Sequence, residues 1–170
     1  MGRHAMVCPS GGGWVRRHNE LRDEAHEIYE ARTNKPALKE QYVPHWSTAR
    51  SEARLDIVGS DALGRDEYVD IAIVHPLCTT VARQAAGCDG AAASNEEKRK
   101  HDRYPGPFLT PAVWEAMGRP GESVQKWMSA VHATCDASER STLVRESWQR
   151  LNCVIQRGNA AMLASAGILA

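Results

Sequence analysis

The fold can be inferred from two neighbouring stretches, Arg54-Leu55-Asp56-Ile57-Val58 and Tyr68-Val69-Asp70-Ile71-Ala72-Ile73-Val74. Both are rich in β-branched residues and alternate polar with apolar side chains, which is typical of half-buried strands. The segment between them contains two glycines and two aspartates, residues that favour turns. The pattern predicts a β-hairpin with a rather long turn.

The register of this hairpin brings two acidic residues together. If the turn is centred on Leu63, residues whose numbers sum to 126 face one another, and Asp56 and Asp70 are such a pair. Their Cβ atoms would then lie about 4.5–5.5 Å apart. Because side chains alternate along a strand, Leu55 and Ile57 are expected on the opposite face, together with the odd-numbered apolar residues of 69–73.

Two opposed carboxylates destabilise a partly buried sheet unless a positive charge lies between them. Mg²⁺ suits such a pair, because it accepts one or two carboxylates, keeps several waters and binds phosphate oxygens. The alternative is a solvated polar face on which Arg54 and Arg65 form ion pairs with the aspartates. Taken alone, the spacing favours this second interpretation.

The rest of the chain predicts a small sheet covered by helices. Residues 16–33 lack Gly and Pro and carry apolar residues at helical spacing, whereas 36–51 contain two prolines and are expected to be mainly loop. The further predicted elements are helices at 91–104, 122–134 and 138–166 and a strand at 108–117. This order predicts an α/β fold with a small mixed sheet and a long C-terminal helix.

Two further groups could assist the aspartates. Lys98, in the charged helix 91–104, could stabilise negative charge on a phosphate or position an attacking water, although a solvated amphipathic helix explains the same charges. Glu20 could be a third carboxylate or an acid that favours the N-terminal end of its helix. The sequence leaves both alternatives open.

Together these motifs resemble the restriction-like endonuclease domain of site-specific non-LTR retrotransposon polyproteins, a branch of the PD-(D/E)XK nucleases. Members carry a basic residue and Pro-Asp, then 12 to 14 residues, an acidic residue, and a lysine in a segment similar to Glu-Lys-Arg-x-Lys-Tyr. The corresponding residues are Arg54-Leu55-Asp56, Asp70 after thirteen residues, Glu97-Lys98-Arg99 with Tyr104 beyond, and Val113 to Arg119. The resemblance covers roughly 16–119.

The resemblance implies a restriction-endonuclease-like fold and a magnesium-dependent DNA endonuclease, with Mn²⁺ as a possible substitute. Asp56 and Asp70 would bind the metal, and Glu20 and Lys98 would complete the catalytic set. The basic residues expected to contact the DNA backbone are Arg99, Lys100, Arg103 and Arg119.

The chain departs from the family pattern at three points. Leu55 replaces the motif proline, and Ala72 stands where simpler members of the class carry their lysine. Two extra residues separate Lys98 from Tyr104, which leaves Lys100 as a rival to Lys98.

Two other functions remain open at this point. One is a catalytically inactive retrotransposon remnant with at most weak nucleic-acid binding. The other is a cysteine-histidine hydrolase built on His75 and Cys78, for which the sequence identifies no orienting carboxylate.

Residues 1–13 are expected to be a flexible remnant preceding a core at 14–120 and a helical extension at 121–170. The remnant resembles the trailing half of a Cys-Cys-His-Cys knuckle. It contains only His4 and Cys8 of four ligands, so we expect no bound zinc. The resemblance suggests that the reading frame begins within a longer ancestral polyprotein, whose remainder would be a partner.

Composition narrows the possible classes of protein. The chain has 170 residues, 42% hydrophobic and 25% charged, which is ordinary for one globular domain. Its 21 basic and 21 acidic residues cancel, so any binding of DNA must depend on a local basic patch. Five irregularly spaced cysteines do not suggest a disulfide framework. No apolar run reaches the length of a membrane span, so we expect a nuclear or cytoplasmic protein without membrane contact.

Overall fold

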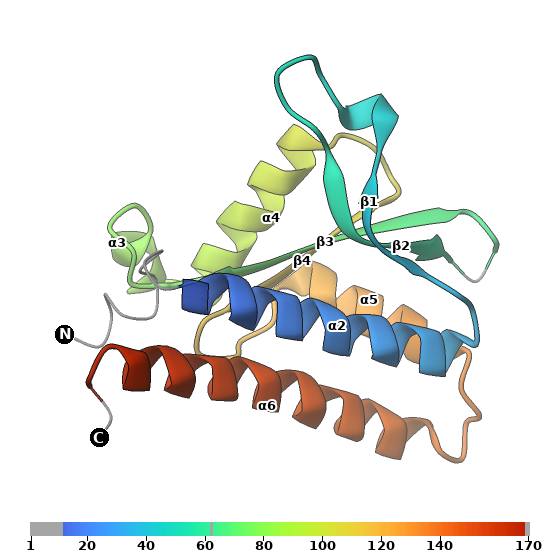
Figure 1. Cartoon of the computed structure of the whole chain (residues 1–170). Helices are drawn as coiled ribbons and strands as arrows, with labels where there is room; N and C mark the ends of the chain where they lie inside the picture. The colour runs from blue at the N-terminus through green and yellow to red at the C-terminus, as the bar shows by residue number, and fades with distance from the viewer. Residues whose placement is uncertain (1–11, 62, 169–170) are drawn as a thin grey trace.

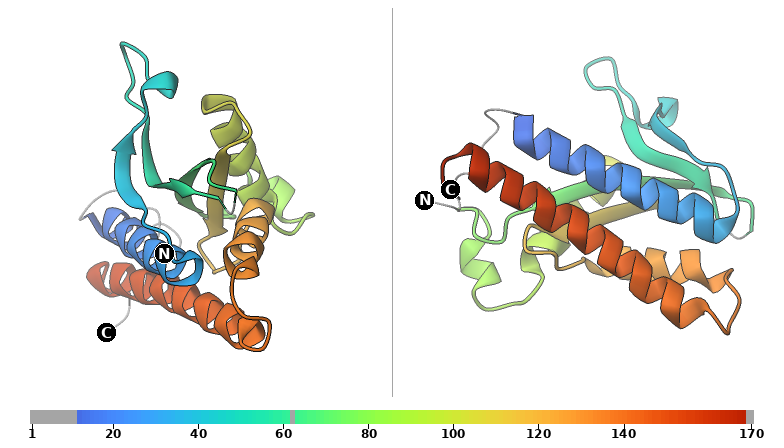
Figure 2. Two further views of the ribbon diagram at one scale, coloured as in Figure 1. Left: turned by 90° about the vertical axis from the view of Figure 1, so that its right-hand side faces the viewer. Right: turned by 60° about the horizontal axis from the view of Figure 1, so that its bottom comes forward.

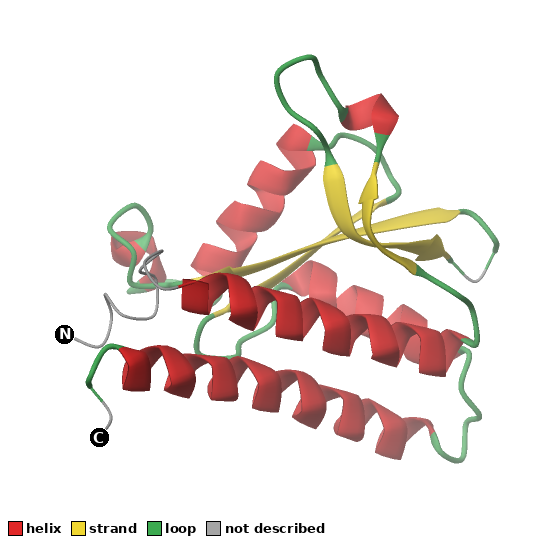
Figure 3. Cartoon of the chain, viewed as in Figure 1, coloured by secondary structure: helices red, strands yellow, loops and turns green. Residues whose placement is uncertain are grey.

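Four strands form one mixed sheet in the order β1-β2-β3-β4 (Figure 1). The computed structural model describes residues 12–61 and 63–168. The strands are β1 (Leu38–Tyr42), β2 (Arg54–Ser60), β3 (Asp66–Val74) and β4 (Leu109–Glu115). The helices are α2 (Gly13–Thr33), the 3-10 helix η2 (Pro44–Trp46), α3 (Ala82–Ala85), α4 (Ala91–Arg103), α5 (Glu122–Ala133) and α6 (Arg140–Ser165). Figure 3 distinguishes the helices from the strands by colour.

The predicted hairpin and its register are confirmed. β2 pairs antiparallel with β3 from Ile57 opposite Val69 to Ser60 opposite Asp66, and every pair sums to 126. Asp61 closes the turn, since its Oδ1 accepts the amides of Leu63 at 2.8 Å and Arg65 at 3.0 Å. β3 and β4 run parallel, with α4 in the crossover between them.

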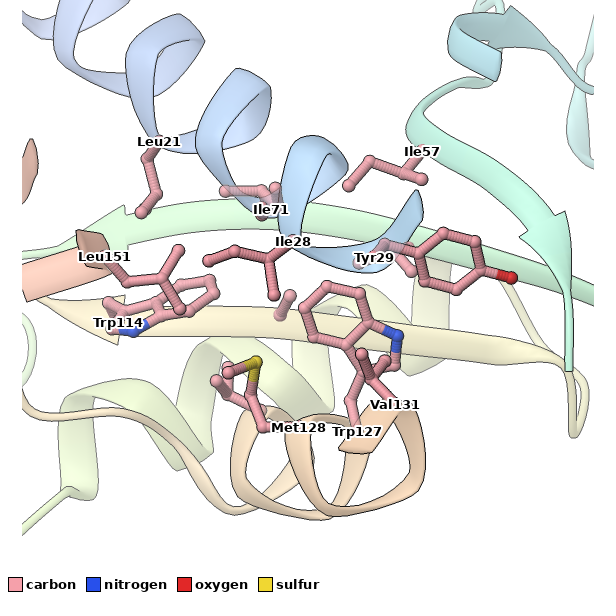
Figure 4. Packing of buried hydrophobic residues seen from close by; sticks show 14 of the residues in the cluster. Leu21, Ile28, Tyr29, Ile57, Ile71, Trp114, Trp127, Met128, Val131 and Leu151 are labelled. Atoms are coloured by element: carbon pink, nitrogen blue, oxygen red, sulfur yellow. The ribbon is translucent and has the colours of Figure 1, made fainter. Parts of the chain in front are cut away.

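The main core lies between one face of the sheet and three helices (Figure 4). Alternate residues of β3 and β4, such as Ile71 and Trp114, point into it. Leu21 of α2, Met128 of α5 and Leu151 of α6 meet them there. Because α5 and α6 supply buried side chains, the helices expected as a 121–170 extension share the core of the sheet.

Helices α2 and α6 pack along each other on this side of the sheet (Figure 2). The contact includes a polar element, in which the buried Arg17 guanidinium donates to Asn159 Oδ1 at 2.5 Å. Asn159 Nδ2 in turn donates to the carbonyl of Ala116, at 2.7 Å, just beyond the end of β4. These bonds connect both helices to the end of the last strand.

Helix α4 covers the opposite face of β3 and β4. It contacts both strands, and its Lys100 pairs with Asp70, whose neighbours Val69 and Ile71 point into the main core. The N-terminal turn of α4 buries three alanines, Ala91, Ala92 and Ala93. One side of the helix is therefore buried, including Glu97 and Lys100, whereas its charges predict a solvated amphipathic helix.

Near the top of Figure 1, β1 and the start of β2 extend away from β3. A second apolar cluster lies in this region. Leu55 belongs to this cluster, together with Tyr104 and Leu109, whereas Ile57 belongs to the main core. Leu55 and Ile57, which were expected on one face of the strand, therefore pack into two different clusters. The β2–β3 pairing ends at Ile57, so the start of β2 diverges with β1 and carries Leu55 elsewhere.

Other differences concern short elements. Strand β1 and helix η2 occupy the segment 36–51 that was expected to be mainly loop, and α3 was not predicted. The long helices and β4 agree with the predicted ranges to within three residues at each end. No helix in 12–61 or 63–168 combines the length and apolarity needed to cross a membrane.

Candidate functional site

An open pocket lies between the diverging start of β2, the middle of β3 and the second half of α4, with the first turns of α2 beside it. Its lining is mostly charged or hydrogen-bonding. The lining residues are His18, Glu52, Arg54, Asp56, Asp70, Arg99, Lys100, Arg103 and Tyr104. The structure thus brings together both aspartates and three of the four predicted DNA-contacting residues.

Asp56 lies one residue before Ile57, where the pairing between β2 and β3 ends. At this position its carboxylate, rather than a backbone carbonyl of β2, accepts a hydrogen bond from β3. Asp56 Oδ2 accepts the backbone amide of Ile71 at 2.6 Å. Asp56 Oδ1 lies 2.9 Å from Nε2 of His18 on α2. Both oxygens are held, so the side chain has a fixed direction toward the pocket.

Asp70 is buried to the same degree as Asp56, but its partner is a charged lysine. Its Oδ2 forms an ion pair with Lys100 Nζ at 2.6 Å, and only 14% and 8% of the two side chains are exposed. Burial raises the pKa of Asp70, and the nearby Asp56 carboxylate adds to the rise, whereas Lys100 opposes it. The carboxyl therefore gains from a cation beyond what Lys100 alone supplies.

The lysine of the site is Lys100, so the prediction that Lys98 points toward the aspartates is wrong. Lys100 Nζ also lies 3.4 Å from the carbonyl oxygen of Ile71, whereas Lys98 is exposed and does not line the pocket. Two positions on a helix differ by about 200° in direction. The buried residues Ala93, Glu97 and Tyr104 set the rotation of α4, and Lys100 lies on their side.

Glu20 is not brought to the pocket either. It is exposed on α2 and lies 4.0 Å from Arg16, and the residue of α2 that reaches the aspartates is His18. The sequence analysis missed His18. A helix of unknown rotation gives no signal that separates His18 from Glu20, because the two lie about 200° apart around it.

The arginines of the pocket differ in how far acidic residues neutralise them. Arg99 donates to Glu96 through Nε at 2.7 Å, and Arg54 Nε lies 3.4 Å from Glu52. Arg103 donates to Ser51 Oγ at 3.2 Å, and its guanidinium lies 5.0 Å from the centroid of the Tyr104 ring. Within the described ranges no carboxylate forms an ion pair with Arg103.

The alternative interpretation, in which Arg54 and Arg65 form ion pairs with the two aspartates on a solvated face, is wrong about those pairs. Arg54 pairs with Glu52, and Arg65 pairs with Asp61 in the hairpin turn. Neither reaches Asp56 or Asp70, which pair with His18 and Lys100 instead.

Of Tyr104 and Arg119, at the two ends of the α4–β4 region, only Tyr104 lines the pocket. Tyr104 is buried against the pocket, and burial followed by the Asp70 charge raises its pKa. Arg119 does not line the pocket. It pairs with Asp89 at 3.0 Å near the C-terminal end of β4.

The residues of the hydrolase alternative make other contacts. His75 Nδ1 accepts the Leu77 amide at 3.1 Å, and Cys78 Sγ lies 3.2 Å from Thr80 Oγ1. Neither contact joins the thiol to the imidazole. The predicted zinc-knuckle residues His4 and Cys8 lie outside the described part of the chain.

The donor set of the pocket fits a cation that needs few protein ligands. No group of three or more His, Cys, Asp or Glu side chains in 12–61 and 63–168 is arranged to hold a metal ion. Asp70 Oδ1 accepts no hydrogen bond from the described residues and is available as a ligand. One or two carboxylates completed by water and substrate oxygens are the usual protein environment of Mg²⁺.

Comparison of the chain with models of known protein families found no match, and comparison with curated proteins found no similar sequence.

Proposed function

We propose that this protein is a magnesium-dependent DNA endonuclease that hydrolyses phosphodiester bonds in the pocket between β2, β3 and α4. The observation that carries the proposal is that Asp56 and Asp70, from neighbouring strands, face one pocket together with the buried Lys100. These groups supply the metal ligands and the positive charge that phosphodiester hydrolysis requires. The resemblance to the restriction-like nucleases of retrotransposons points to the same chemistry.

Asp56 and Asp70 would hold Mg²⁺, which supplies Lewis-acid activation of a phosphate oxygen and of water. The two carboxylates differ in their supports. The Ile71 amide and His18 orient Asp56, whereas Asp70 has one oxygen on Lys100 and the other uncommitted. Burial and the Asp56 charge raise the pKa of Asp70, and a bound cation would offset both effects.

Lys100 takes the role that the family motif assigns to a lysine. Its ammonium group is held at 2.6 Å from Asp70 Oδ2 and at 3.4 Å from the Ile71 carbonyl, so its position is determined before substrate arrives. A fixed ammonium beside the carboxylates can stabilise negative charge that develops on a phosphate or orient water.

The outer part of the pocket would hold the DNA backbone. Arg54, Arg99 and Arg103 surround the aspartates, and arginine matches phosphate oxygens with planar, paired hydrogen bonds. Such contacts position a nucleic acid without reading its sequence.

The test is a nicking assay with supercoiled plasmid and Mg²⁺ on the parent chain and three variants. We expect the parent to nick, and Asp70→Asn and Lys100→Met each to lower the rate by about 100-fold or more, a typical loss for a fixed electrostatic group. Lys98→Met is the matched control, since it removes an exposed lysine of the same helix. It should keep the parent's rate within about twofold.

A parent chain that nicks neither single-stranded nor duplex DNA, with Mg²⁺ or Mn²⁺, would favour the inactive remnant. Loss of nicking in Lys98→Met but not in Lys100→Met would restore the original motif alignment and contradict the assignment of the lysine. Chelation by EDTA should abolish nicking, and added Mg²⁺ should restore it.

A further inference from the structure

A cluster of aromatic rings begins at the pocket wall and continues over the outer surface of the molecule. Tyr104 lines the pocket, and its ring centroid lies 5.4 Å from that of Trp46 in η2. Trp46 in turn lies 5.1 Å from Tyr68 and 4.5 Å from His45. The rings thus lead outward from the two aspartates to His45, which is exposed.

A hydrogen bond and ring contacts hold this aromatic cluster in a fixed arrangement. Trp46 Nε1 donates to the Pro105 carbonyl at 2.9 Å, and His45 meets the Tyr68 ring nearly edge-on at 5.6 Å. Tyr104 is buried, whereas Trp46 and Tyr68 are half-buried. A rigid set of rings that becomes more exposed with distance from the pocket can take up a further planar ring at its outer end.

The charge beside the aromatic cluster indicates what that ring belongs to. Arg103 lines the pocket, packs on Tyr104 at 5.0 Å, and has no carboxylate partner within the described ranges. An arginine without a carboxylate partner, next to aromatic rings of which the outermost is exposed, matches the alternation of phosphate and base along a nucleic-acid strand. An apolar peptide would leave this charge unused.

We propose that His45, Trp46 and Tyr68 form a stacking surface for an unpaired nucleotide of the DNA strand, whose phosphate Arg103 binds. The proposal deepens the proposed function and rests on it for the identity of the polymer. Stacking needs a base whose face is accessible, so the favoured ligand is single-stranded DNA or a strand splayed next to the pocket rather than a continuous duplex.

The test measures fluorescence anisotropy of a labelled oligo-dT strand and of a labelled duplex of equal length, both in EDTA. His45→Ala removes an exposed ring and spares the buried part of the aromatic cluster. We expect it to weaken single-strand binding by about tenfold, the lower part of the range for loss of one stacking contact. Duplex affinity should change by less than twofold.

Two further variants separate the contribution of the rings to DNA binding from that of the arginine charge. Trp46→Ala should weaken single-strand binding at least as much, and its thermal unfolding is measured because Trp46 also packs in the fold. Arg103→Ala should weaken both forms of DNA and reduce the salt slope by about one. Trp14→Ala is the matched control, because Trp14 is 45% exposed in the first turn of α2 and does not line the pocket.

The proposal is overturned if His45→Ala binds oligo-dT as the parent does, or if strand and duplex lose affinity equally. It is also overturned if the parent chain binds no DNA. These binding results do not depend on nicking. A parent that binds single strands through His45 but does not cut would contradict the endonuclease and retain the stacking surface.

Discussion

Lys100 combines three properties that no other basic side chain of the pocket has. It is buried, it pairs directly with Asp70, and it approaches the backbone of β3 through the Ile71 carbonyl. Burying an ammonium group costs free energy unless a partner compensates. Lys100 and Asp70 are therefore interdependent in the metal-free protein, and neither can be removed alone without exposing that cost.

This interdependence predicts the stability of Asp70 variants. If the repulsion between Asp56 and Asp70 is considered alone, Asp70→Asn should relieve it and give a fold at least as stable as that of the parent. Lys100 reverses the sign of the expected change in stability, because Asp70→Asn leaves a buried ammonium without its counter-charge. We expect Asp70→Asn and Lys100→Met each to cost about 3 kcal/mol of the free energy of unfolding, at the low end for a broken buried pair.

The double variant Asp70→Asn/Lys100→Met should recover most of that loss, since no buried charge remains unpaired. Urea denaturation of the four proteins in EDTA measures the coupling between the two side chains. Additive losses, or an Asp70→Asn protein that is more stable than the parent, would show that Lys100 does not compensate Asp70.

At the scale of elements, the junction between α4 and α5 holds the pocket's helix in place. Glu97 is buried on α4, and its Oε1 accepts the Ser123 amide in the first turn of α5 at 3.0 Å. This bond satisfies one of the free amides at the N-terminus of α5. Glu97 lies three residues before Lys100, so the same contact helps to set the rotation that directs Lys100 at Asp70.

The Gly121→Ala variant tests this junction. An added Cβ would clash with Glu97 Oε1 and lie 3.1 Å from the Val113 carbonyl oxygen, so Glu97 or the backbone must move. We expect a loss of about 2 kcal/mol, typical of an overpacked site. Gly87→Ala is the control, because its Cβ would meet only the Gln84 carbonyl at 3.9 Å. Equal urea midpoints for the two variants would contradict a close-packed α4–α5 junction.

For the whole molecule, zero net charge means that attraction to DNA has to come from a local group of cations, and the pocket provides one. Arg54, Arg99 and Arg103 are the exposed cations there, and Lys100 is already paired. If each arginine contacts one phosphate, the logarithm of the duplex association constant should fall with the logarithm of salt concentration at a slope of about −3.

Anisotropy titrations between about 50 and 200 mM salt measure that slope. A value near zero would mean that these arginines do not contact phosphates. A slope steeper than about −6 would mean that basic residues outside the pocket carry the binding.

The parts of the structure that depend on local order were predictable. The hairpin and its register follow from alternating side chains and from the turn residues around Leu63, and the pairing of Ile57 with Val69 agrees with them. The helix ends follow from Pro, which lacks a backbone N–H, and from Gly, whose conformational freedom disfavours a helix interior. Strand β1 was missed because its residues are mostly exposed and show no alternation of buried and exposed positions.

Which residues join the two aspartates was decided only in the tertiary structure. The choice of Lys100 over Lys98, and of His18 over Glu20, depends on the rotation of a helix about its axis. That rotation is set by packing against residues distant in sequence, such as Glu97 against Ser123 and Leu21 against the core of the sheet. Spacing along a helix fixes the angle between two side chains, whereas only long-range packing determines which of them faces the site.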